Sequence, residues 1–315
     1  MNHAEMPESV TFCGRSFSRS ELELMRQIAG EFAGLGRTEI ARTICELLEW
    51  KRPRGGLKNH ECRQLLERLA EQGWLRLPQV RQLGPRGPRR VAVTAQSEPQ
   101  APLEGTAGEY EPLRLTVVEA GSADSALWRE LVARHHYLSY RVPVGAQLRY
   151  LVRAERTGEA VLACLQWTSA AWKMAARDQW IGWTHAQRAR NLGFIVNNSR
   201  FLILPWVRIK GLASKILAHA ARQLPGDWER RYGYRPLLLE TLVDGQRFAG
   251  TCYRAANWIA LGQTTGRGRM DRYHQADGSA RKLVLVYPLC PNVQQWLREA
   301  SPPRFTEPAP EPDWA

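Results

Sequence analysis

Two carboxylates, Glu240 and Asp244, stand at the end of an apolar run, residues 237–243, that is typical of a buried strand. On a strand, residues at even spacing point to the same face of the sheet, so the two side chains should face the same way. Such a pair could hold a divalent metal ion for cleavage of a phosphodiester bond, or could act as general acid and base. The structural alternative is a buried carboxylate that pairs with a nearby arginine such as Arg247.

A second group of reactive side chains, His135, His136 and Tyr137, precedes a predicted strand. The imidazoles could bind a phosphate or a metal ion, and the phenol could act as a nucleophile. Neighbouring residues on a strand point to opposite faces, so on a strand the two histidines would not share one metal ion. The structural alternative is one buried histidine and one surface histidine.

A motif of small residues, Arg208-x-x-Gly211-x-Ala213, follows an apolar run at 201–204 and opens a predicted helix at 213–224. Small residues allow the backbone N–H groups at a helix N-terminus to approach a phosphate closely. The motif therefore predicts a phosphate site. Its structural alternative is an ordinary turn between a strand and a helix.

The segment 201–262 resembles the GCN5-related N-acetyltransferase family, in which a strand ends in (Arg/Gln)-x-x-Gly-x-(Gly/Ala) and a helix follows. The resemblance implies that Arg208, Gly211 and Ala213 bind the pyrophosphate of coenzyme A, so acetyl-CoA is one implied cofactor. A divalent metal ion is the other cofactor that the candidate residues suggest.

The later part of the same segment resembles the closing Tyr-x-x-x-Gly-Phe stretch of that family. The resemblance implies a general-acid role for Tyr253. Asn257-Trp258 replaces the Gly-Phe pair in this chain. No acidic residue is obviously placed as the base of the family, although Glu240 is a candidate.

Basic residues gather in the first part of the chain, and the whole chain has a formal net charge of +13, which favours polyanionic partners. Arginine and lysine suit contacts to the phosphates of DNA, with some reaching base edges. The alternative is a basic surface used for protein contact. The residues that we expect to bind nucleic acid are Arg52, Arg54, Lys58, Arg63, Arg81, Arg86, Arg89 and Arg90, with Arg267 and Arg269 in a later glycine-rich loop.

The elements that position this charge are predicted as three helices and a two-stranded wing. A capping box at Ser18 and Glu21 opens the first helix, Thr38 is expected to cap the second, and Asn59 the third. Short strands at 74–78 and 91–94 then flank an arginine-rich ribbon. This order predicts a winged helix-turn-helix over residues 1–94, whose third helix would enter the major groove of DNA.

Residues 95–112 are rich in Pro, Gly, Ala and Glu, which predicts a linker. Beyond it, strand-like and helical runs over 113–300 predict an α+β or α/β domain with a mixed sheet. Its strands are expected at 113–118, 147–154, 159–168, 201–204, 237–243 and 259–262. The composition of residues 301–315 predicts a disordered acidic tail.

The cysteines bear on the compartment. The six cysteines are scattered without a C-x-x-C pair, which argues against a zinc knuckle or a disulfide framework. No stretch has the length and hydropathy of a signal peptide or a membrane-spanning helix. We therefore expect a cytoplasmic protein with no membrane partner.

Three long stretches, HHYLSYRVPVGAQLRYLV (135–152), NNSRFLILPWVRIKGLASKIL (197–217) and LLETLVDGQRFAGTCYRAANWIALGQTTGRGR (238–269), resemble the Druantia DruA family of prokaryotic anti-phage defence proteins. Relatives of that family also occur in insertion-sequence contexts. The resemblance implies defence or mobile-element biology, including transposition, with partner proteins from those systems. It implies no catalytic residues.

Three functions are compatible with this sequence. The first is a DNA-associated defence or mobile-element protein that binds DNA through the winged helix. The second is a metal-dependent nuclease or strand transferase. The third is an N-acyltransferase that depends on coenzyme A.

Overall fold

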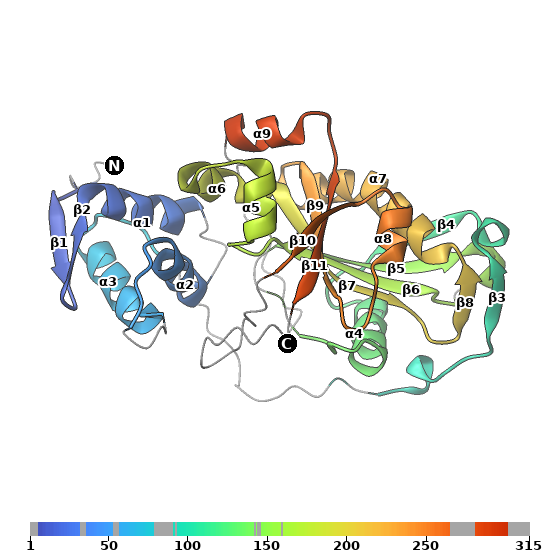
Figure 1. Ribbon diagram of the computed structural model, residues 1–315. Helices are drawn as coiled ribbons and strands as arrows, with labels where there is room; N and C mark the ends of the chain where they lie inside the picture. Colours follow the sequence, from blue (N-terminus) through green and yellow to red (C-terminus); the bar gives the residue numbers. More distant parts are fainter. Residues whose placement is uncertain are drawn as a thin grey trace. The chain divides into compact units, whose positions relative to one another are not determined.

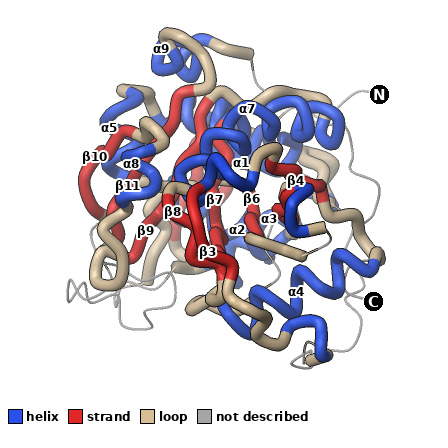
Figure 2. The backbone as a smooth tube through the Cα atoms, turned by 90° about the vertical axis from the view of Figure 1, so that its right-hand side faces the viewer, coloured by secondary structure: helices blue, strands red, loops and turns tan. Residues whose placement is uncertain are grey.

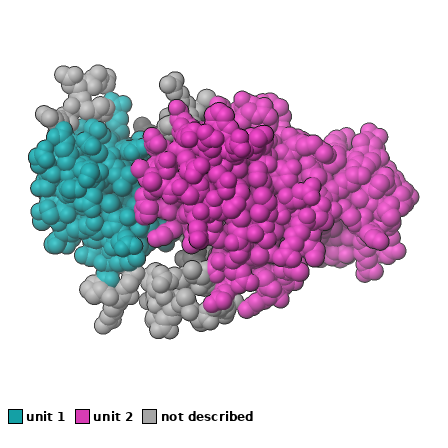
Figure 3. Space-filling model, turned by 45° about the horizontal axis from the view of Figure 1, so that its top comes forward, with its two compact units in different colours: residues 1–83, 266–279 teal, residues 84–265, 280–315 magenta. Residues whose placement is uncertain are grey.

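The computed structural model describes residues 6–31, 36–52, 57–78, 91, 93–141, 143, 146–158, 160–264 and 281–301. The chain divides into two compact units, which Figure 3 shows in different colours. Unit 1 comprises residues 1–83 and 266–279, and unit 2 comprises residues 84–265 and 280–315. Each unit has its own hydrophobic core.

Unit 1 begins with a β-hairpin, β1 (Ser9–Phe12) and β2 (Arg15–Ser18), that we did not predict. The two connecting residues, Cys13 and Gly14, have φ values of 49° and 76°. Two left-handed residues in succession make the tight turn whose twist matches that of a hairpin. Phe17 of β2 is fully buried in the core of the unit, so the hairpin packs against the helices that follow.

Three helices follow the hairpin, as predicted: α1 (Arg19–Glu31), α2 (Arg37–Leu47) and α3 (Asn59–Glu71). The capping box at the start of α1 is confirmed, because the backbone N–H of Ser18 donates to Glu21 Oε2 at 2.9 Å and that of Glu21 donates to Ser18 Oγ at 3.4 Å.

The predicted caps of the other two helices are each misplaced. Gly36 and Lys58 hold the N-cap positions of α2 and α3, and neither contributes a side-chain hydrogen bond. Thr38 and Asn59 lie within the first turns instead. The apolar face of α3 is placed as predicted, with Cys62, Leu65, Leu66 and Leu69 all buried in the core of unit 1.

The predicted wing is not shown. Residues 74–78 carry no strand, and neither do Val91, Val93 and Thr94. The arginine-rich middle of the wing, residues 79–90, lies outside the described residues. Unit 1 is thus a hairpin and three helices in the part of the chain that the structure describes.

Unit 2 is a mixed α/β unit, which confirms the predicted class. Its described residues form a sheet of seven strands in the order β10-β11-β9-β7-β6-β5-β4. All neighbours are antiparallel except β7 and β9, which run parallel. The strands are β4 (Leu113–Val117), β5 (Gln147–Ala154), β6 (Ala163–Ser169), β7 (Ile195–Ile203), β9 (Leu238–Asp244), β10 (Ile259–Gln263) and β11 (Lys282–Pro288).

Helices cover both faces of this sheet (Figure 1). On one face, Arg153 of β5 pairs with Asp124 of α4 at 2.7 Å. On the other face, Tyr150 of β5 donates to Asp227 of α7 at 2.8 Å. No helix in the described ranges is both long and apolar enough to cross a membrane. The α-helices of this unit are α4 (Ala123–His135), α5 (Ala175–Ile181), α6 (His185–Asn191), α7 (Leu212–Tyr232), α8 (Thr251–Ala255) and α9 (Val293–Glu299).

The segment that we expected to be a linker contains regular structure. β3 (Leu103–Thr106) pairs in parallel with β8 (Val207–Lys210), and a 3-10 turn (Ala107–Tyr110) follows it. The two strands lie side by side in Figure 2. The Tyr110 ring is buried in the core of unit 2, and its hydroxyl donates to the carbonyl of Glu104 at 2.7 Å. Burial of this ring holds the segment against the unit.

Candidate functional site at the opening between β7 and β9

The parallel strands β7 and β9 separate part way along the sheet. Their ladder joins Ile195–Asn198 to Leu238–Thr241 and ends there. Beyond it, β7 continues beside β6 to Ile203, while β9 continues beside β11 to Asp244. The register of β6 and β7 shifts at the same level, where Trp167 is opposite Asn198 and Gln166 is opposite Arg200. A bulge of this kind bends a strand, which accounts for the divergence.

Polar side chains from three elements meet where the strands separate. The hydroxyl of Tyr253, on α8, donates to Asn198 Oδ1 at 2.6 Å, and the hydroxyl of Thr241 lies 3.4 Å from the same phenol oxygen. The amide of Asn198 is held in turn, because its Nδ2 donates to the carbonyl of Gln166 at 3.1 Å. Burial raises the pKa of Tyr253, so this phenol stays protonated at neutral pH.

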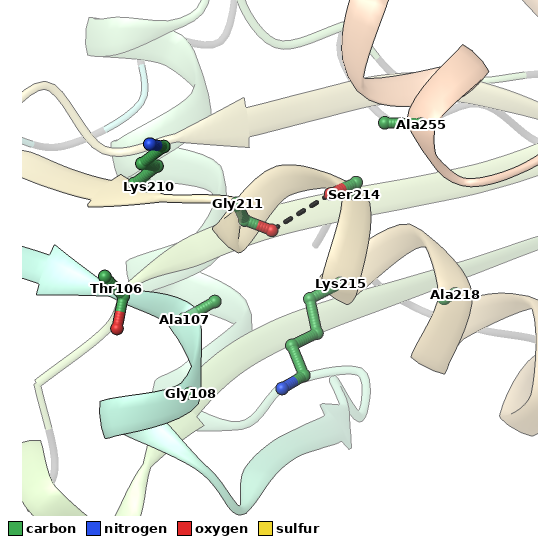
Figure 4. Close-up of a pocket in the computed structure, with 9 residues that line it drawn as sticks. All are labelled: Thr106, Ala107, Gly108, Lys210, Gly211, Ser214, Lys215, Ala218 and Ala255. Carbon is green, nitrogen blue, oxygen red and sulfur yellow. Dashed lines mark hydrogen bonds between the residues drawn. The ribbon is translucent and has the colours of Figure 1, made fainter.

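A hollow of about 550 Å³ lies at the N-terminus of α7. Figure 4 shows the residues that line it, and one of them, Ala255, belongs to α8, the helix that carries Tyr253. Gly211 is the N-cap of α7 and has a φ of 78°, a conformation that favours glycine. The first backbone N–H groups of an α-helix have no acceptor within the helix, so they are open to an anion. The residues that line the hollow are Thr106, Ala107, Gly108, Lys210, Gly211, Ser214, Lys215, Ala218 and Ala255.

The three residues of the phosphate motif are not equivalent in this arrangement. Gly211 lines the hollow, whereas Arg208 and Ala213 are not among its lining residues. The Arg208 side chain is 70% exposed and lies 3.9 Å from Glu104 of the neighbouring β3. A lysine that we did not single out, Lys215, lies at the hollow and pairs with Glu111 at 3.0 Å.

Glu240 belongs to a buried ion-pair network and not to an open site. Its side chain is 0% exposed, and its carboxylate accepts hydrogen bonds from Ala171 N at 3.2 Å and from Arg177 Nη1 at 2.9 Å. Arg177 also donates to Asp178, and its guanidinium lies 5.7 Å from the ring centroid of Trp183. Glu240 is therefore a buried carboxylate that pairs with an arginine, as in the structural alternative considered above, but the arginine is Arg177 and not Arg247.

Asp244, which was to share a metal ion with Glu240, lies in a different environment. Its carboxylate is 3.5 Å from the guanidinium of Arg247 and accepts a hydrogen bond from the backbone of Gln246. The described residues contain no group of three or more His, Cys, Asp or Glu side chains that could hold a metal ion. The geometry thus argues against the predicted carboxylate metal site, because Glu240 has both oxygens engaged.

The two histidines lie at the C-terminal end of α4. His135 Nε2 is 2.9 Å from the carbonyl of Ser97, and its ring packs edge-on against Trp206. His136 Nδ1 accepts a hydrogen bond from the backbone of Leu138 at 3.1 Å, and its ring stacks on Tyr137. Burial, with a smaller contribution from the positive charge of Arg200, lowers the pKa of His136 to about 4. The structure therefore brings His136 and Tyr137 together and holds the imidazole neutral.

The predicted DNA-binding residues are described only in part. Arg52 pairs with Glu61 at 2.7 Å, Arg63 lies 3.8 Å from Glu67, and Lys58 lies 5.9 Å from the ring centroid of Trp50. These acidic partners offset part of the positive charge expected there. The remaining residues lie outside the described part of the chain: Arg54, Arg81, Arg86, Arg89, Arg90, Arg267 and Arg269.

Sequence reasoning missed Asn198 and Thr241, which orient Tyr253. A usable signal was present, since Asn197-Asn198-Ser199 interrupts an otherwise apolar strand, and a polar run inside a buried strand needs hydrogen-bond partners. The bulge beside Asn198 depends on pairing with β6 and has no local signature.

We predict that Glu240→Ala lowers the free energy of unfolding by about 3–5 kcal/mol, because it leaves the buried Arg177 guanidinium without its main anionic partner. Urea denaturation measures this effect. The double variant Arg177→Met/Glu240→Leu should recover much of the loss, since it removes both charges. Asp244→Ala is the control and should have a small effect, and equal losses for the two single variants would contradict the assignment.

We also predict a pH dependence that comes from His136. Its folded-state pKa is lowered, so the unfolded chain binds a proton more readily, and stability falls as the pH drops from about 6.5 towards about 4. Protonation of Nδ1 would also remove the hydrogen bond from Leu138. His136→Asn should reduce the difference between urea midpoints at pH 7 and pH 5. A variant with the wild-type pH profile would show that another group is responsible.

Comparison with known proteins adds the family. Three solved structures are similar to parts of the chain at low TM-scores. A mutant agmatine N-acetyltransferase without ligand is 10% identical, with 56% of this chain and 99% of that chain covered and a TM-score of 0.34. Malonyl-CoA decarboxylase from Cupriavidus metallidurans is 11% identical, with 60% of this chain and 65% of that chain covered and a TM-score of 0.35, and an N-acyl amino acid synthase from uncultured soil microbes is 10% identical, with 58% and 93% covered and a TM-score of 0.32. No curated protein is significantly similar. The family model described as "Druantia protein DruA" matches residues 69–283, more than half of the sequence. The chain is thus a member of the Druantia DruA family.

Proposed function

We propose that this chain acts in anti-phage defence and that unit 2 binds an acyl-CoA at the opening between β7 and β9. The family supports the biological role. The observation that carries the ligand is the position of α8: this short helix places Ala255 at the hollow beside the N-terminus of α7 and the buried Tyr253 hydroxyl at the separation of β7 and β9. An extended ligand with an anionic end and a reactive end fits this arrangement.

The residues of the hollow fit a pyrophosphate. Gly211 allows close approach to the backbone, the first N–H groups of α7 have no acceptor within the helix, and Lys210 adds positive charge beside Lys215, which pairs with Glu111. Small side chains at Ala107, Gly108 and Ala218 leave room. Of the three motif residues, Gly211 lines the hollow, and Lys215 rather than Arg208 is the basic side chain that follows it there.

Tyr253 can act on the reactive end of such a ligand. When bound, acyl-CoA supplies an activated acyl group with a thiolate leaving group. Tyr253 keeps its proton on Oη because burial raises its pKa, and Asn198 and Thr241 fix the position of the phenol oxygen. The one O–H of Tyr253 donates to Asn198 Oδ1, so rotation of this O–H away from Asn198 would let the phenol donate a hydrogen bond or a proton to a departing thiolate. The order of β7, the motif, α7, β9 and then α8 with Tyr253 is the order of strand, helix and Tyr segment on which the GCN5-related resemblance rests.

Calorimetry with acetyl-CoA tests the ligand. We expect saturable heat for the wild-type chain and a loss of at least tenfold in affinity for Ser214→Glu, which adds a negative charge beside the phosphates, about 1.4 kcal/mol or more. Glutamate in the first turn of a helix is favourable, so the variant should fold. Ser214→Ala should bind like wild type, and no heat for the wild-type chain at high ligand concentration would overturn the proposal.

A second proposed function, contact of unit 1 with duplex DNA, is favoured by one observation on α3. His60, Gln64 and Arg68, at a spacing of four residues, are all exposed, while the opposite face of the helix is buried. Side chains at this spacing lie on one side of a helix, and glutamine and arginine can read base edges in the major groove.

A gel-shift series at several salt concentrations tests this contact. Arg68→Ala should weaken duplex binding and reduce the slope of log affinity against log salt by about 0.9 if the side chain neutralises one phosphate. The triple variant Arg86→Ala/Arg89→Ala/Arg90→Ala should reduce the slope further. Arg42→Ala, which removes an arginine paired with Glu39 on α2, is the control. Absence of wild-type binding at low salt would refute duplex contact.

A further inference from the structure

An exposed aromatic cluster lies beyond the C-terminal end of α4, and its residues do not line the hollow at α7. Three of the six most exposed large apolar side chains among the described residues occur here: Tyr137 (38%), Leu138 (38%) and Phe248 (51%). Tyr137 and Leu138 follow α4, and Phe248 follows β9. The rings of Tyr137 and Phe248 have centroids 5.6 Å apart, so the cluster joins two loops that are distant in the sequence.

Guanidinium groups surround this cluster. The Arg247 guanidinium lies 5.2 Å from the ring centroid of Tyr137, and its side chain is 61% exposed. Arg200 donates to the carbonyl of Ser139, in the loop that carries Tyr137. Burial lowers the pKa of Arg200, and the charge of Arg141 acts in the same direction, so the two cations are close enough to repel each other. We call these residues the aromatic–arginine patch: Tyr137, Leu138, Arg141, Arg200, Arg247 and Phe248.

The charge of the patch is unbalanced. Asp244 is the carboxylate that the structure places in it, at 3.5 Å from Arg247 and close enough to raise the pKa of Tyr137 together with burial. Among the residues that the structure describes, the patch holds three guanidiniums against one carboxylate, which favours an anionic partner. An anion beside Arg200 and Arg141 would also relieve their mutual repulsion.

The combination of flat apolar faces and guanidiniums limits the chemical classes of partner that fit the patch. Unpaired bases stack on aromatic rings and on guanidinium planes, while the phosphates of the same strand pair with arginine. A duplex keeps the faces of its bases inside the helix, and an acidic peptide would leave the exposed face of Phe248 unpartnered. We propose that the aromatic–arginine patch binds single-stranded nucleic acid. The proposal is independent of acyl-CoA binding and of duplex contact by unit 1.

Fluorescence anisotropy with a short labelled oligothymidylate, and with the same label on a duplex, tests the proposal on the full chain. Phe248→Ala should weaken binding of the single strand by roughly 5- to 100-fold, the range expected for loss of one stacked base, and should leave duplex binding unchanged. Phe248→Trp should restore binding, because tryptophan also offers a flat face.

Arg247→Ala provides a second, electrostatic readout. The slope of log affinity against log salt for the single strand should fall by about 0.7 if this side chain contacts one phosphate. The matched controls are Trp296→Ala, which removes an exposed ring on α9, and Arg235→Ala, which removes an exposed arginine beyond α7. Both controls should bind the single strand like wild type.

The outcomes separate the proposal from its competitors. Equal affinities of Phe248→Ala, Trp296→Ala and wild type for the single strand would overturn it. So would a loss for Phe248→Ala that is the same for duplex and single strand, since this would place the effect outside base stacking. Circular dichroism melting of each variant excludes loss of the fold as the cause of weaker binding.

Discussion

The brief parallel pairing of β7 and β9 is the constraint on which the rest of unit 2 depends. Four residue pairs join the strands, and each strand then follows its antiparallel neighbour. Backbone groups released at such a separation need other partners. Asn198 meets part of this need from inside the opening, since its amide bonds to the carbonyls of Gln166 and Arg200 and accepts from Tyr253. Asn198 and Tyr253, to which we give a functional role, thus also satisfy hydrogen-bonding groups at the separation of the two strands.

On the opposite face of the same ladder, a buried ion pair joins Arg177 of α5 to Glu240 of β9. Arg177 is fully buried and donates to Glu240, to Asp178 and to the carbonyl of Ala171, so its guanidinium is well supplied with acceptors. Burial of a charge pair costs desolvation free energy that the attraction offsets only when the geometry is good. The Arg177–Glu240 pair connects α5 to β9 through a buried contact.

Features that depend on residues close together in the sequence were predictable, whereas features that depend on residues far apart in the sequence were not. The capping box of α1 and the apolar face of α3 were predictable because both depend on residues within two helical turns. β3 was not, because its partner Val207–Lys210 lies about a hundred residues later and its composition resembles that of a linker. The partner of Glu240 was not predictable for the same reason: Arg177 lies in a helix between β6 and β7, far from Glu240 in the sequence, whereas Arg247 was the arginine expected from the sequence. In the candidate site, Gly211 followed from a local motif, whereas the position of Asn198 required the register of three strands.

The pairing of β3 with β8 also affects how the mixed-sheet unit can be isolated. A fragment that began at Leu113 would retain every strand of the large sheet but would lose β3 and the Tyr110 ring. Its β8 edge would then be unpaired immediately before Gly211, and exposed strand edges promote self-association. A fragment that begins ahead of Leu103 would keep β8 paired with β3. The N-terminal boundary of the fragment therefore decides whether the turn at Gly211 keeps its native surroundings in the isolated unit.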